Sequence, residues 1–205
     1  MTAAAGVALA AALAAAPLGD PLASLRRTAG KTRIEASGTL ETVMLLAGLA
    51  APPADPTAFQ SGALARFSLA AHHPAVRETA ALLERGLGWP ELARLASFMA
   101  PAPHFLMPPS EELTELAALL PGGHVGFNLD RLHGYTKLVR EFYWDNHVGR
   151  YLAGVREHYA EALARPLPAD VPAGAKVLVS PLAPSGRLQF TRRRPSPLTY
   201  IVLGG

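Results

Sequence analysis

The 205-residue sequence predicts an α+β fold, in which a mostly helical N-terminal two-thirds is followed by a small antiparallel β-meander. Between residues 39 and 165, proline and glycine recur at intervals that suit short helices, and apolar residues repeat at spacings of three and four. After Pro166 the chain changes to short β-rich runs separated by turn residues. We therefore expect a single domain over residues 33–205, with a helical part at 39–165 and the meander at 175–205.

Composition narrows the classes of partner. Half of the residues are hydrophobic, which is enough for a sizeable core at this length. The net charge is only +3, and the basic residues are scattered except for Arg192, Arg193 and Arg194, so we predict no nucleic-acid partner. The absence of cysteine excludes disulfides, thiolate zinc sites and cysteine nucleophiles.

Residues 1–22 form a candidate signal peptide or apolar leader. The stretch "AAGVALAAALAAAPLG" at 3–18 is uncharged and ends in small residues, like the apolar region and cleavage site of a secretory signal. No Lys or Arg precedes Arg26, so an Ala-rich helix or a missing N-terminal piece are alternatives. With a signal the protein is secreted or periplasmic, and otherwise cytoplasmic. The apolar run is shorter than the about 20 residues of a membrane helix, so we expect no stable membrane insertion.

The first elements are a strand and a helix. "RIEASG", residues 33–38, alternates polar and apolar residues and predicts a short strand. Thr39 is then placed to cap the helix "LETVMLLAGLA", with Glu41 in its first turn, where the helix dipole favours a carboxylate.

Four more helices are expected before residue 125, each with a start signal. Asp55, followed by proline, opens the first of them. Pro74 starts "PAVRETAALLER", Pro90 starts "PELARLASFMA", and Ser110 caps "EELTELAALL".

The stretch "REFYWDNHVGRYLAGVREHY", residues 140–159, combines an apolar stripe with a dense polar cluster. We expect a helix that begins after a cap at Asn128 and breaks at Asp145 and Asn146, which are both natural caps. His147 would then lie in the first turn of the following helix.

Five residues are candidates for a binding site, although none is assigned a catalytic role. Tyr143, Trp144, Asn146 and His147 can form the wall of a ligand cleft, or they can be packing residues and a helix cap. The apolar period runs through this cluster, so we interpret it mainly as a helix seam with one polar edge. His73, in "AHHPAV", is a candidate ligand-binding group or a helix cap.

No metal or nucleophile motif is present. His-Glu-x-x-His and His-x-x-Glu-His sequences are absent, and neither Ser180 nor Ser185 has the glycines of a nucleophile elbow. We predict no metal ligands in this chain. A complete metalloenzyme that uses Glu41, His72 and His73 is a less favoured alternative.

The C-terminal runs "KVLVSPL", "RLQFTRR" and "LTYIVLGG" are separated by Pro-Ser-Gly and Pro-Ser-Pro turns, which favour an antiparallel meander. The basic segment "TRRRPSP", residues 191–197, can bind anions or can protect an edge strand from aggregation, and we favour protection.

Several of these stretches occur together, in order: a strand before "LETVMLLAGLA", then "FSLAAHHPAVRETAALLERGLGWPE", "FYWDNHVGRYLAGVREHY" and "KVLVSPLAPSGRLQF…LTYIVLGG". Over residues 33–205 the sequence resembles the bacterial proteins grouped as domain of unknown function 4932. Longer members of that family continue past the last strand into a helix with a His-Glu-Phe-x-His type sequence, which is similar to a zinc-peptidase ligand pair. In thermolysin-like peptidases, by analogy of fold, a sheet precedes such a helix and its edge strand can hold an extended peptide.

The resemblance implies the N-terminal portion, or a truncated relative, of an exported zinc-metallopeptidase-like protein. The chain stops at Gly205 without the ligand helix, so we expect no catalytic competence alone, and zinc only where that helix is present. The alternative is a non-catalytic module that binds a peptide or protein in a cleft near Trp144 and His147.

Overall fold

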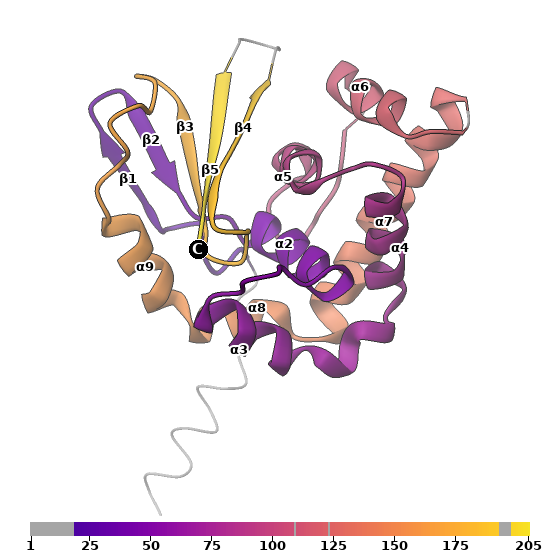
Figure 1. The fold of residues 1–205 in the computed structure, drawn as a ribbon, viewed down its shortest axis with the longest axis horizontal. Coiled ribbons are helices and arrows are strands. Elements are labelled where there is room, and N and C mark those ends of the chain that lie inside the picture. The colour runs from indigo at the N-terminus through magenta and orange to yellow at the C-terminus, as the bar shows by residue number, and fades with distance from the viewer. Residues whose placement is uncertain (1–18, 109, 123, 193–197) are drawn as a thin grey trace, which may run out of the picture.

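The computed structural model describes residues 19–108, 110–122, 124–192 and 198–205, and confirms the α+β class. Within these ranges the chain forms eight α-helices, one 3₁₀ helix and a five-stranded sheet, with the helices beside and below the sheet in the view of Figure 1. The elements are, in order, β1 (Arg26–Ala29), β2 (Thr32–Glu35), α2 (Gly38–Ala50), α3 (Ala58–Arg66), a 3₁₀ helix (Ser68–His72), α4 (Pro74–Glu84), α5 (Trp89–Phe98), α6 (Glu111–Leu119), α7 (Val125–Asp145), α8 (Val148–Gly154), α9 (Arg156–Ala164), β3 (Lys176–Ser180), β4 (Gly186–Arg192) and β5 (Leu198–Gly204).

The sheet is mixed, which corrects the expected antiparallel meander. Its strand order is β1-β2-β3-β5-β4, with β2, β3 and β5 parallel and the outer strands β1 and β4 antiparallel to their neighbours. The parallel pairing of β2 with β3 is made possible by the whole helical region, which serves as the long crossover that parallel strands need. The turn residues between the C-terminal strands cannot show that β3 pairs with β2, which lies far away in the sequence.

Helix α2 forms the centre of the core. It lies between the sheet and helices α4, α5 and α7 in Figure 1, and most of its residues are buried because it is apolar on nearly all sides. Ser37, rather than Thr39, caps it by accepting a hydrogen bond from the Leu40 N–H at 3.3 Å. The Thr39 hydroxyl donates instead to the carbonyl oxygen of Ala100 at 3.2 Å.

Other helix boundaries follow the sequence signals in part. Ser110 caps α6 and Pro74 opens α4, as expected. Helix α3 is capped by Thr57 rather than Asp55. Helix α7 begins at Val125, and Asn128 is a buried residue inside it, whose side-chain amide donates to the Ala117 and Leu120 carbonyl oxygens at the end of α6.

The N-terminal boundary of the described fold overlaps the candidate leader. Residues 1–18 lie outside the described residues, but Leu22 is fully buried and the Asp20 carboxylate accepts a hydrogen bond from the Gly38 N–H at 2.9 Å. The sheet also includes β1, upstream of residue 33. Among the helices that the structure describes, none has the length and hydropathy needed to cross a membrane.

Candidate functional site

The four candidates from residue 143 to 147 lie at the junction of α7 and α8. Tyr143 is buried, whereas Trp144 is 43% exposed and packs edge-on against the Tyr143 ring. Asn146 is the C-cap of α7, and its side-chain amide donates to the Phe142 carbonyl oxygen at 3.1 Å. His147 is exposed, with a left-handed backbone (φ 52°), and precedes the first residue of α8.

His73 joins this junction from α4. Its Nδ1 accepts a hydrogen bond from the Ala75 N–H at 3.1 Å, so His73 caps α4. Its Nε2 lies 3.5 Å from a carboxylate oxygen of Asp145, and its ring packs edge-on against Phe142. These contacts tie the start of α4 to the end of α7, which is a structural role.

Tyr143 fills a tight space beside α8. A Cβ added to Gly149 would overlap the Tyr143 hydroxyl group, so the glycine makes room for the ring. The hydroxyl oxygen is buried with no hydrogen-bond partner, and burial raises the pKa of Tyr143 to about 12. We conclude that Tyr143 packs the helix seam and that Trp144 and His147 are the solvent-facing members of the cluster.

The alternative metal site is not assembled. Glu41 is fully buried in α2, where Tyr159 Oη donates to its Oε2 at 2.8 Å and the Leu182 N–H at 3.4 Å. His73 makes its contacts at the end of α7 instead. Across the described ranges no group of three or more His, Cys, Asp or Glu residues is placed to hold a metal ion.

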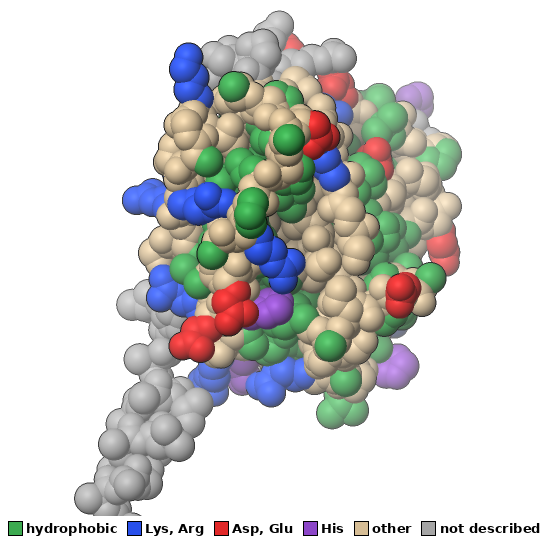
Figure 2. All heavy atoms as spheres, turned by 60° about the vertical axis from the view of Figure 1, so that its left-hand side comes forward, with side chains coloured by type: hydrophobic (Ala, Val, Ile, Leu, Met, Phe, Trp, Pro, Cys, Tyr) green, Lys and Arg blue, Asp and Glu red, His purple; other side chains and the backbone are tan. Residues whose placement is uncertain are grey.

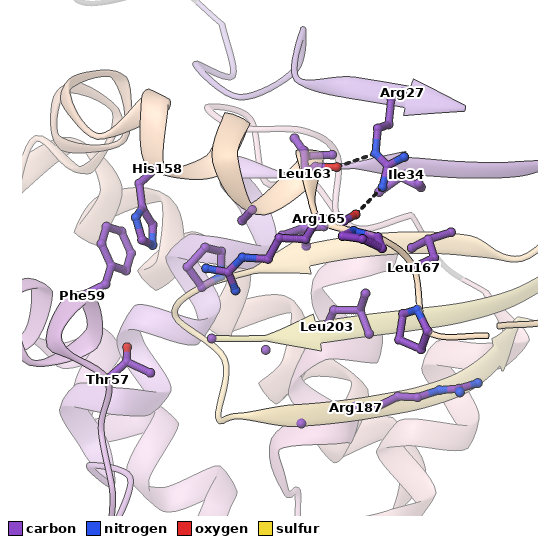
Figure 3. A pocket seen from close by; sticks show the side chains of 18 of the residues that line it. Arg27, Ile34, Thr57, Phe59, His158, Leu163, Arg165, Leu167, Arg187 and Leu203 are labelled. Atoms are coloured by element: carbon purple, nitrogen blue, oxygen red, sulfur yellow. Dashed lines mark hydrogen bonds between the residues drawn. The ribbon is translucent and has the colours of Figure 1, made fainter. Parts of the chain in front are cut away.

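A cavity of about 840 Å³ lies elsewhere, between α9, residues 165–170, the start of α3 and one face of the sheet (Figure 3). Neither Trp144 nor His147 lines it. Its walls are mainly apolar and include Ile34 from β2, Val179 from β3 and Leu203 from β5. The strand register places these three side chains on the same face of the sheet. Figure 2 shows hydrophobic side chains among Lys and Arg side chains on this side of the molecule.

Three arginines line the cavity and differ in their partners. Arg27 donates hydrogen bonds to the carbonyl oxygens of Leu163 and Arg165, which holds the end of α9 over the sheet. Arg187 forms an ion pair with Asp170 at 2.5 Å. The side chain of Arg165 runs across the cavity in Figure 3 and has no hydrogen-bond or ion-pair partner among the described residues.

The start of α3 closes another side of the cavity. The side-chain amide of Gln60 donates to the carbonyl oxygens of Pro181 and Ala183, at 3.2 and 2.6 Å, and so fixes α3 to the segment after β3. Phe59 stacks on the His158 ring of α9, with 4.0 Å between ring centroids. These contacts hold the walls in place without a ligand.

The sequence did not predict the cavity, because its lining residues come from many segments that are far apart along the chain. Arg165 follows a predicted helix and precedes a proline, and this pattern predicts only a helix end. No local pattern indicates that this arginine lies above the sheet.

Strand β4 is the second feature of interest. It is an edge strand that pairs only with β5 among the described strands, and its Gln189 and Thr191 are exposed. Its first residues, Gly186 and Arg187, also line the cavity. The outer edge of β4 therefore carries main-chain groups that no described strand pairs with, although helix α5 packs against part of β4.

Comparisons with protein-family models, curated proteins and solved structures found no match to this chain.

Proposed function

We propose that this protein binds an extended peptide or protein segment along the free edge of β4, as the substrate-binding part of an exported zinc-peptidase-like protein. The single observation that carries the proposal is the position of β4: an outer strand, antiparallel to β5, with no further strand beside it in the described sheet. An added segment would gain main-chain hydrogen bonds there at no cost to the existing sheet.

The sequence resemblance gives the same role to this part of the chain. In the related longer proteins a helix with the ligand pair follows the last strand, and here the last strand is β5, the neighbour of β4. By analogy with thermolysin-like peptidases, an edge strand in that position holds the substrate. The resemblance therefore supports peptide binding at β4 more than at the α7–α8 junction.

Hydrolysis is not part of the proposed role of the described residues. Glu41, the buried carboxylate considered for a metal site, is instead bonded to the Tyr159 hydroxyl group and the Leu182 N–H. We expect the 205-residue chain to bind peptides without cleaving them in the presence of zinc.

Binding can be tested with a displayed library of random octapeptides selected on the immobilised chain. Gln189 and Phe190 are adjacent on β4, so one of them directs its N–H to β5 and the other directs it outward. Proline at the outward position removes a donor from the free edge and leaves the ladder intact. Of Gln189→Pro and Phe190→Pro, the variant that stays folded should bind the selected octapeptide at least about tenfold more weakly, since several main-chain bonds are lost together.

Gln189→Ala is the matched control, because it keeps the main-chain N–H and should bind like the parent chain. Equal binding by the parent and the folded proline variant would overturn the proposed site. The peptidase relationship has its own test: DNA that follows codon 205 without encoding a His-Glu-x-x-His helix, in frame or after a frameshift, would remove its support.

A further inference from the structure

We infer that the cavity beneath α9 is a separate ligand site for a small amphipathic carboxylate, with an unbranched alkyl chain against the sheet and one carboxylate group at Arg165. This site goes beyond peptide binding at the edge of β4. Its volume of about 840 Å³ lies within the range of about 300–1,000 Å³ that is typical of small-molecule sites.

The walls favour an alkyl chain over a peptide. Pro166, Pro168 and Pro181 line the cavity and have no main-chain N–H to offer. The Arg27 side chain already donates to two carbonyl oxygens. A peptide bond placed against these prolines would lose hydrogen bonds to water and gain none from their missing N–H groups, whereas an alkyl chain has none to lose.

The charges select one anionic group. Three arginines and one aspartate are among the lining residues, which leaves an excess of positive charge. Asp170 neutralises Arg187, and Arg27 is held by backbone carbonyls, so Arg165 is the guanidinium of the three that has no partner among the described residues. A guanidinium and a carboxylate can form a pair with two parallel hydrogen bonds, and the exposed Arg165 side chain is accessible for such a pair.

His158 and Phe59 form one side of the site. The His158 ring is stacked face to face on Phe59, and both residues line the cavity. The Arg165 side chain points toward this side in Figure 3, which places the charged group near Phe59 and leaves the region over Leu203 and Ile34 for the chain.

Decanoate, with decanol and acetate as single-feature controls, tests the inference by calorimetric titration of the full chain. Decanoate should bind at one site, while decanol and acetate should each bind at least about tenfold more weakly, because each lacks one half of the match. Arg165→Gln should weaken decanoate about tenfold and leave decanol unchanged. Arg150→Gln, which changes an exposed arginine outside the cavity, should alter neither.

A second measurement locates the ligand without any substitution. Methyl NMR signals of Ile34, Val179 and Leu203 should shift as decanoate is added, and Leu203→Trp, if folded, should abolish binding by filling the cavity. Absence of decanoate binding, equal binding of decanol, insensitivity to Arg165→Gln, or shifts confined to other methyl groups would each overturn the inference. So would concentration-dependent dimerisation that buries these methyl groups, because the occupant would then be a second copy of the chain.

Discussion

Glu41 gives the sharpest prediction about stability, because it is a carboxyl group with no exposure to solvent. Burial raises the pKa of Glu41 from 4.5 to about 7, against the opposing effect of hydrogen bonds from Ser180, Tyr159 and the Leu182 N–H. Its other oxygen, Oε1, is buried without a hydrogen-bond partner. The folded state therefore favours the protonated acid, whereas the unfolded chain ionises near 4.5.

The sign and size of the effect follow by linkage. A raised folded-state pKa means that the folded protein binds more protons, so the contribution to stability is fully present below pH 4.5 and is lost as the pH rises to about 7. At about 1.4 kcal/mol for each pH unit, the interval from 4.5 to about 7 corresponds to about 3 kcal/mol in total. Between pH 5 and pH 8 the free energy of unfolding should fall by about 2–3 kcal/mol on account of Glu41 alone.

Urea denaturation of the parent and Glu41→Gln at pH 5 and pH 8 measures this contribution. The amide is neutral at both pH values, so the free energy of unfolding of the variant should fall less between pH 5 and pH 8 than that of the parent. Relative to the parent, the variant should therefore be more stable at pH 8 than at pH 5. Glu84→Gln is the matched control, because Glu84 is an exposed carboxylate on α4, and it should keep the parental pH dependence. If the free energy of unfolding of Glu41→Gln falls between pH 5 and pH 8 as much as that of the parent, ionisation of Glu41 does not destabilise the folded state and the reasoning is refuted.

Three further substitutions test the packing around the two sites. Gly149→Ala should destabilise by about 1–3 kcal/mol, because its Cβ would overlap Tyr143, whereas Gly134→Ala has open space and should not destabilise; thermal unfolding compares them. Gln60→Leu should lower the free energy of unfolding by about 1–3 kcal/mol, because the Pro181 carbonyl oxygen loses its hydrogen bond and the Ala183 carbonyl oxygen keeps only the 3.4 Å bond from the Gly205 N–H; a loss below about 0.5 kcal/mol in urea would contradict this. Trp144→Ala should unfold near the parental temperature, because its ring is 43% exposed; a loss of fold would show that the ring is part of the core.

Local signals in the sequence placed several elements because their chemistry is local. Ser110 caps α6 because its hydroxyl reaches the Leu113 N–H, three residues away. The helix break after Asp145 follows from the Asn146 side chain, which bonds to the last turn of α7. Where two suitable capping residues lie near a helix start, the sequence does not show which of them is the N-cap. Ser37 and Thr57 cap α2 and α3, although Thr39 and Asp55 have equally suitable side chains.

The remaining features depend on contacts between distant segments. Glu41 was expected in a first helical turn, and it is there, but its burial comes from Tyr159, which is 118 residues further along the chain. The parallel pairing of Ile34 with Val177 likewise has no local signature. The cavity has no local signature either, because Arg165 lines it together with strand residues from both ends of the described chain.

Amide hydrogen exchange, with and without a selected octapeptide, tests peptide binding at β4 most directly. We predict that the peptide slows exchange of alternate amides in Gly186–Arg192, whose N–H groups point away from β5, and leaves the other outer strand, β1, unchanged. A peptide that binds with unchanged exchange along β4, and with protection at the α7–α8 junction near Trp144 and His147, would contradict the proposal.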